Sequence, residues 1–158
     1  MLCKFLALAA TAASLLLMSP ATRAADDHPA FRVAVSGNPQ GQPIILIPGL
    51  ASSGEVWNGT VAHYCGAAQP QFQCHVLTLA GFAGVPAIEG ALLPAAEQQL
   101  AEYIGAHHLA HPVVIGHSLG GFLALKLAAD HPDQVGKLVI VDAVPCLVAA
   151  TQMPGATA

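Results

Sequence analysis

A chain of 158 residues is long enough for one domain with a hydrophobic core. Only 9% of the residues are charged and 54% are hydrophobic, which favours strands that are covered on both faces. Because the chain holds five Lys and Arg in total, with a formal net charge of -4, it has no basic surface for a phosphate backbone, and nucleic-acid binding is disfavoured.

The first 24 residues have the pattern of a secretory signal peptide. Lys4 supplies the positive start, residues 5–18 form an apolar run, and small residues precede a predicted cleavage after Ala24. A spanning helix needs about 20 apolar residues, and this run is shorter. We therefore expect residues 1–24 to be removed, no stable membrane anchor to remain, and the mature part to be secreted or periplasmic.

Three cysteines follow the predicted cleavage site, namely Cys65, Cys74 and Cys146. Disulfides persist outside the cytoplasm, so Cys65 and Cys74 could be bridged across a short loop. The two could equally be buried thiols, and the sequence leaves both alternatives open. No Cys or His spacing fits a metal site, and we expect neither a metal nor an organic cofactor.

The elements expected along the chain alternate between strands and helices. Short unbroken runs of branched apolar residues predict buried strands, and apolar residues at helical spacing predict amphipathic helices. In chain order we expect a strand at 31–36, a buried strand at 43–47, a helix at 55–64 with Trp57 facing the core, a buried strand at 74–79, a helix from Pro94 to about 108, a buried strand at 113–115, a helix at 119–130 and a buried strand at 138–141. This alternation predicts an α/β fold, with a mostly parallel sheet and helices on both faces.

The clearest chemical motif is G-x-S-x-G, formed by Gly116, Ser118 and Gly120 between a predicted buried strand and a predicted helix. A serine at the tip of so sharp a turn is strained, and glycines two residues before and after it avoid a clash. Ser118 is therefore the candidate nucleophile, with the positive end of the following helix directed at the reaction centre. The alternative is an ordinary glycine-rich turn; a phosphate-binding loop is disfavoured because its Lys is absent.

A nucleophilic serine needs two backbone N–H donors for the oxyanion that forms during acyl transfer. The residue after the nucleophile, Leu119, supplies one. The loop that follows the predicted strand at 43–47 is the usual source of the other, and Leu50 is the best match. Taken alone, Pro48-Gly49 is equally well a turn that ends the strand.

These motifs together resemble the α/β-hydrolase superfamily, in its serine esterase-like branch. The matching segments, in the family's order, are IPGL at 47–50, LTLAGFAG at 77–84, GHSLGG at 116–121 and LVIVD at 138–142. The resemblance implies carboxylic-ester hydrolysis of a small-molecule acyl substrate through an acyl-enzyme on Ser118. Carbon–carbon bond hydrolysis, amide hydrolysis and perhydrolysis use the same turn and stay open as alternative reactions.

The resemblance extends to the amino-terminal portion of the family's pattern only. In the family the nucleophile is followed by an acid and then by a His, but sixteen residues follow Asp142 and none is His. We expect a partial hydrolase domain at 25–158, truncated after the strand that follows the nucleophile helix, with 143–158 as the start of a cut-off cap or tail. Asp142 is expected to be structural rather than catalytic. The alternative function is therefore a catalytically inactive fragment or binding module.

Overall fold

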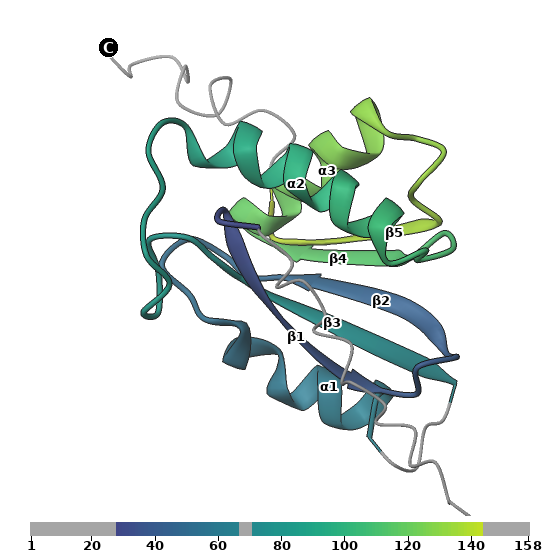
Figure 1. Cartoon of the computed structure of the whole chain (residues 1–158). Coiled ribbons are helices and arrows are strands. Elements are labelled where there is room, and N and C mark those ends of the chain that lie inside the picture. The colour runs from purple at the N-terminus through teal and green to yellow at the C-terminus, as the bar shows by residue number, and fades with distance from the viewer. Residues whose placement is uncertain (1–27, 67–70, 144–158) are drawn as a thin grey trace, which may run out of the picture.

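The central element is a sheet whose strands, within the described residues, lie in the order β1-β3-β2-β4-β5 (Figure 1). The computed structural model describes residues 28–66 and 71–143. The strands are β1 Phe31–Gly37, β2 Gln42–Ile47, β3 Phe72–Leu79, β4 Val113–His117 and β5 Lys137–Val141. The strands β2 to β5 are parallel to one another, and β1 runs antiparallel to β3. The prediction of a mostly parallel α/β sheet is confirmed.

Helices cover both faces of this sheet, also as predicted (Figure 1). The helices α2 Leu92–Ala106 and α3 Leu119–Asp130 lie on one face, and α1 Asn58–Tyr64 lies on the other. Successive side chains of β2 point to opposite faces, so Ile45 packs in the core under α2 and α3 while Leu46 packs in the core under α1. This double coverage is why β2, in the middle of the sheet, is an unbroken apolar run.

Two elements differ in detail from the sequence prediction. A 3-10 turn at Gly54–Trp57 precedes the shorter helix α1, because the Ser53 hydroxyl caps the turn by accepting from the Glu55 N–H. Trp57 is half-buried and packs against the core under α1. The helix α2 begins two residues before Pro94, which its first turn tolerates because the N–H groups there have no helical partner.

A disulfide joins Cys65 to Cys74, and both residues are buried. Cys65 follows the last residue of α1, and Cys74 lies in β3. The bond therefore fastens α1 to the sheet. The predicted signal peptide at 1–24 and the cysteine at position 146 lie outside the described residues, as does the predicted tail after residue 143.

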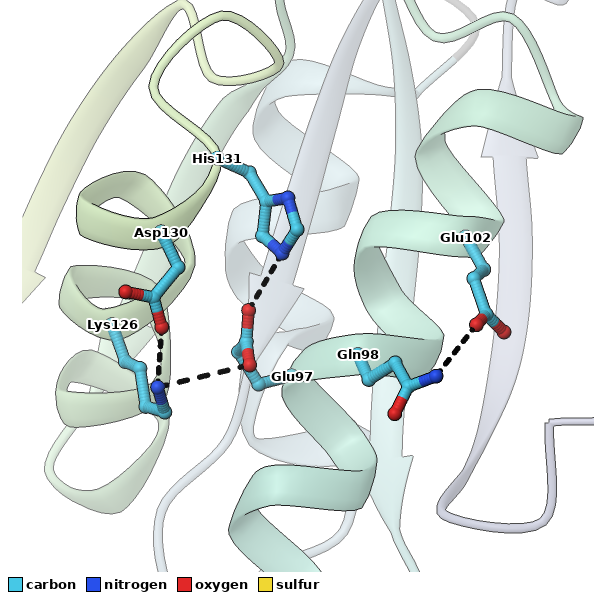
Figure 2. A network of polar contacts seen from close by, with 6 residues as sticks. All are labelled: Glu97, Gln98, Glu102, Lys126, Asp130 and His131. Carbon is cyan, nitrogen blue, oxygen red and sulfur yellow. Dashed lines mark hydrogen bonds and ion pairs between the residues drawn. The ribbon is translucent and has the colours of Figure 1, made fainter.

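The carboxylate of Glu97 links α2 to the far end of α3 (Figure 2). Its Oε1 atom lies 2.9 Å from His131 Nε2, and its Oε2 atom lies 3.8 Å from Lys126 Nζ. Lys126 also donates to Asp130, and this hydrogen bond lowers the pKa of the Asp130 carboxyl. The polar cluster thus lies between the start of α2 and the end of α3 that is remote from Ser118.

A buried histidine, His75, lies within β3 and is 2% exposed. Its Nε2 atom lies 3.0 Å from the Gln73 Oε1 atom, and its Nδ1 atom lies 2.7 Å from the Tyr103 hydroxyl. Burial, with a smaller effect from His107, lowers the pKa of His75 to about 4. The ring is therefore neutral at pH 7, and with Nε2 donating to Gln73 its Nδ1 accepts from the tyrosine.

Candidate active site

Ser118 occupies a strained turn between β4, which ends at His117, and α3, which begins at Leu119. Its backbone has φ 51° and ψ -116°, a region that residues with a side chain rarely adopt. The N–H of Ser118 donates to the carbonyl of Val141 at 2.9 Å, which ties the turn to the end of β5. Its hydroxyl makes no capping hydrogen bond to α3, so the oxygen is not occupied by the helix N-terminus.

The glycines around Ser118 are required by close backbone contacts. A Cβ atom on Gly116 would lie 2.2 Å from the carbonyl oxygen of Gly120, so the residues before and after the serine meet as the motif predicts. A Cβ atom on Gly120 would instead lie 2.4 Å from the carbonyl oxygen of Ile47. The second glycine is thus needed for packing against the end of β2, a reason that the motif alone did not provide.

The loop after β2 reaches the serine turn. A Cβ atom on Gly49 would lie 3.4 Å from the Ser118 Cβ atom, so the Gly49-Leu50 segment borders the nucleophile. Among the hydrogen bonds between described residues, none uses the N–H of Leu50 or of Leu119. These two N–H groups, one in the segment that borders Ser118 and one directly after it, therefore have no acceptor among the described residues, and an oxyanion site needs donors of this kind.

The described histidines do not provide a base that is hydrogen-bonded to Ser118. His111 lies at the opposite end of the sheet, where its carbonyl accepts from the side chain of Gln42 at the start of β2. His131 follows the last residue of α3, also far along the chain from the turn. The ring of His117, next to the serine, lies against Gly49.

Asp142 directly follows β5 and has a left-handed backbone with φ 48°. Because β4 and β5 are parallel and His117 pairs with Val141, Asp142 lies at the same edge of the sheet as Ser118. The carboxylate is exposed to solvent. Within the part of the chain that the structure describes, there is no group of three metal-ligating side chains and no helix suited to crossing a membrane.

Sequence reasoning missed two contacts of this site. One is the hydrogen bond from Ser118 to Val141, and the other is the approach of the His117 ring to Gly49. The only sequence signal for the second was the glycine itself, which fits a strand-ending turn equally well.

A parallel sheet with a strained serine at the carboxyl end of β4 defines an α/β protein with its candidate site at that edge. The family model for the alpha/beta hydrolase fold matches residues 42–156. The chain therefore belongs to the α/β-hydrolase family, as the resemblance of its motifs predicted.

Among curated relatives, the chain is 32% identical over 126 residues to a pimeloyl-(acyl-carrier protein) methyl ester esterase of Aeromonas hydrophila subsp. hydrophila, a match that covers 78% of this chain and 46% of the relative. A protein of the same name from Vibrio cholerae serotype O1 is 35% identical over 111 residues, covering 70% of this chain and 40% of the relative. The solved structure of a marine microorganism esterase matches with a TM-score of 0.61 at 27% identity and covers 70% of this chain and 41% of that one. The chain thus spans less than half the length of these relatives.

Proposed function

We propose that the protein is a serine hydrolase that cleaves a carboxylic ester of a small-molecule acyl substrate, with Ser118 as the nucleophile. The observation that carries this proposal is the strained Ser118 turn, whose hydroxyl makes no capping hydrogen bond to α3. The N–H groups of Leu50 and Leu119 near this turn have no hydrogen-bond partner among the described residues. The esterase relatives support the choice of ester hydrolysis over the other reactions of this fold.

In the proposed mechanism the Ser118 oxygen attacks the ester carbonyl carbon while its proton passes to a general base. The carbonyl oxygen becomes an oxyanion that accepts hydrogen bonds from the N–H groups of Leu50 and Leu119, each donor lowering the barrier by about 3 kcal/mol. Collapse of the tetrahedral intermediate breaks the bond between the carbonyl carbon and the alkoxy oxygen. The leaving oxygen takes the proton from the protonated base and departs as the alcohol, leaving an acyl-enzyme on Ser118. Water then attacks the acyl group, and the acid leaves as Ser118 recovers its proton.

A second candidate function is a catalytically inactive chain that acts as a binding module. The observation in its favour is that no described histidine is hydrogen-bonded to the Ser118 hydroxyl. Without a base, the hydroxyl is a weak nucleophile at neutral pH.

We also propose that the protein works outside the cytoplasm, in a secreted or periplasmic form. The sequence of residues 1–24 and the Cys65–Cys74 disulfide support this location, because structural disulfides persist in oxidising compartments.

The test is to treat the purified chain with a fluorophosphonate probe and to measure hydrolysis of p-nitrophenyl acetate. The proposal predicts labelling and turnover by the parent chain, with turnover lowered about a thousandfold or more in Ser118→Ala, and such turnover would require a base other than the described histidines. The matched control is Ser36→Ala, an exposed serine of β1, which should behave as the parent. Turnover that survives Ser118→Ala would refute the assignment, and a parent chain with neither labelling nor turnover would favour the inactive module.

A further inference from the structure

The ring of His117 and the backbone of Gly49 are in close contact. A Cβ atom built on Gly49 would lie 2.9 Å from His117 Nδ1 and 3.4 Å from Cε1. The φ angle of Gly49 is not in the left-handed region, so a side chain is not disfavoured there by the backbone. A side chain at this position would therefore have to displace the imidazole.

Gly49 itself is buried, and the N–H of Gly54 donates to Thr78 Oγ1 at 2.9 Å, but the segment at 50–53 between them has few other restraints among the described residues. Its turn is closed by the Ser52 N–H donating to the Gly49 carbonyl at 3.3 Å, and the Ser52 hydroxyl donates to the Leu50 carbonyl at 3.4 Å. Both distances are long for hydrogen bonds of their type. The Leu50 side chain is 64% exposed, so packing does not fix this residue either.

His117, in contrast, is firmly placed. It is the last residue of β4, where it pairs with Val141 of β5, and it is half-buried. Because the sheet holds the backbone that carries this ring, the ring can support the loop segment that rests against it. The Gly49-Leu50 peptide, which ends in the proposed oxyanion donor, rests against that support.

We infer that His117 is a positioning residue, which orients the Gly49-Leu50 peptide so that the Leu50 N–H points at the oxyanion. The inference rests on the proposed function, since it assigns a role within the same site. A donor helps the transition state only when it is already aimed at the developing charge, so loosening its support should slow catalysis without weakening substrate binding. If the ring only filled space, its removal would lower stability and leave both kcat and KM unchanged.

The first test compares steady-state kinetics on p-nitrophenyl acetate. We expect His117→Ala to lower kcat about tenfold with KM unchanged, because the donor is misdirected rather than removed. His117→Asn places an amide where Nδ1 lies and should keep kcat within about threefold of the parent. The control His63→Ala removes an exposed imidazole of α1 and should leave kcat unchanged. Equal kcat values for the parent and His117→Ala would overturn the inference.

A double-mutant cycle tests the contact itself. The methyl group of Gly49→Ala would meet the ring at 2.9 Å and push it away, so this variant should also lose kcat. Once the ring is gone the methyl has nothing to displace, and Gly49→Ala combined with His117→Ala should lose no more than His117→Ala alone. Losses that multiply would show that the two residues act independently and would overturn the inference.

A measurement that needs no turnover separates this inference from the proposed function. The heteronuclear ¹⁵N NOE of the Gly49 and Leu50 amides should fall in His117→Ala and stay at the parent value in His63→Ala. If the parent chain shows no turnover, the proposed function fails and these amides still decide the positioning role. Amides that keep their order in a folded His117→Ala variant would overturn it.

Discussion

Ser118 keeps a backbone conformation that costs about 1–3 kcal/mol relative to an ordinary one. Three features of its surroundings hold it there. The Ser118 N–H is bonded to Val141, Gly116 meets Gly120 without side chains between them, and Gly120 fits against the end of β2. The strain is thus maintained by contacts that involve β2, β4 and β5. Glycine occurs at positions 116 and 120 because a Cβ atom at either would clash with a backbone oxygen.

Replacing Gly116 by alanine tests that steric reason. The new Cβ would lie 2.2 Å from a backbone oxygen, which cannot move aside as a flexible side chain would, so Gly116→Ala should cost about 2–3 kcal/mol. Gly105→Ala in α2 is the matched control, because nothing lies within 4 Å of its added Cβ and alanine favours the helix by about 0.5–1 kcal/mol. Urea denaturation of both variants measures the difference. Equal stabilities would show that the turn can relax around a methyl group.

The buried His75 predicts a dependence of stability on pH. Its folded pKa of about 4 is below the ordinary 6.5, so the unfolded chain binds a proton first as the pH falls. The contribution of neutral His75 to the free energy of unfolding is complete above pH 6.5, declines between pH 6.5 and 4, and is lost below pH 4. At about 1.4 kcal/mol per pKa unit, the loss is about 3 kcal/mol.

The measurement for His75 is the free energy of unfolding at several pH values. His75→Gln removes the titrating group and should flatten the decline between pH 6.5 and 4, whereas the exposed His63→Gln should not. An unchanged slope in His75→Gln would assign the pH dependence to the carboxylates instead.

At the scale of single residues the sequence was informative where a motif demands one conformation. The pattern of glycines marks the Ser118 turn because only hydrogen fits at Gly116. The Gly49–His117 contact joins a loop to a strand end that are distant in the sequence, and no local pattern encodes such a pairing. The His75–Tyr103 hydrogen bond is likewise not encoded by a local pattern, since it depends on how α2 packs against β3.

At the scale of elements, the types and order of all the predicted strands and helices are found in the structure, and the bounds differ by a few residues. The helix at 119–130 has the predicted limits because Ser118 and His131-Pro132 end it on both sides. The helix expected at 55–64 was wrong in its first turn, where the Ser53 cap favours a 3-10 turn. The direction of β1 was not predictable, because an alternating strand fits either direction.

The disulfide between α1 and β3 contributes to stability at the scale of elements. Its loop is short, with a sequence separation of 9, and closing such a loop in the unfolded chain is worth about 2–3 kcal/mol. We expect Cys65→Ser and Cys74→Ser each to lower the melting temperature. Dithiothreitol should lower the melting temperature of the parent and of the control, and should not lower that of these two variants further. The control Cys146→Ser leaves the bond intact. A parent unaffected by the reductant, with free thiols by mass spectrometry, would contradict the bond.

At the scale of the whole molecule, β5 is an outer strand of the sheet. The strand β5 has a sheet partner on one side only within the described residues, and Val139 and Val141 on it are 44% and 40% exposed. Both valines point to the face opposite α3, since Leu138 and Ile140 pack in the core beneath that helix. An open apolar edge of this kind favours pairing between chains.

We therefore expect the apparent molar mass of the 158-residue chain, measured by light scattering, to rise with concentration. Val139→Lys places a charge on the open strand and should reduce that scattering severalfold. The control Val56→Lys changes an isolated valine that is 58% exposed, away from the sheet edge, and should not. Scattering that falls equally in both variants would indicate a general effect of charge and not pairing of β5.

The hydrogen bond from the Ser118 amide to the Val141 carbonyl gives the outermost strand an influence on the reactive oxygen. Fraying at the end of β5 would break this hydrogen bond and so release one restraint on the strained serine. An interaction that stabilises the end of β5 would restore the bond. The orientation of the Ser118 hydroxyl is therefore thermodynamically coupled to the order of the carboxyl end of β5. Because such coupling is reciprocal, a ligand that requires the oriented serine must also stabilise that end of the strand.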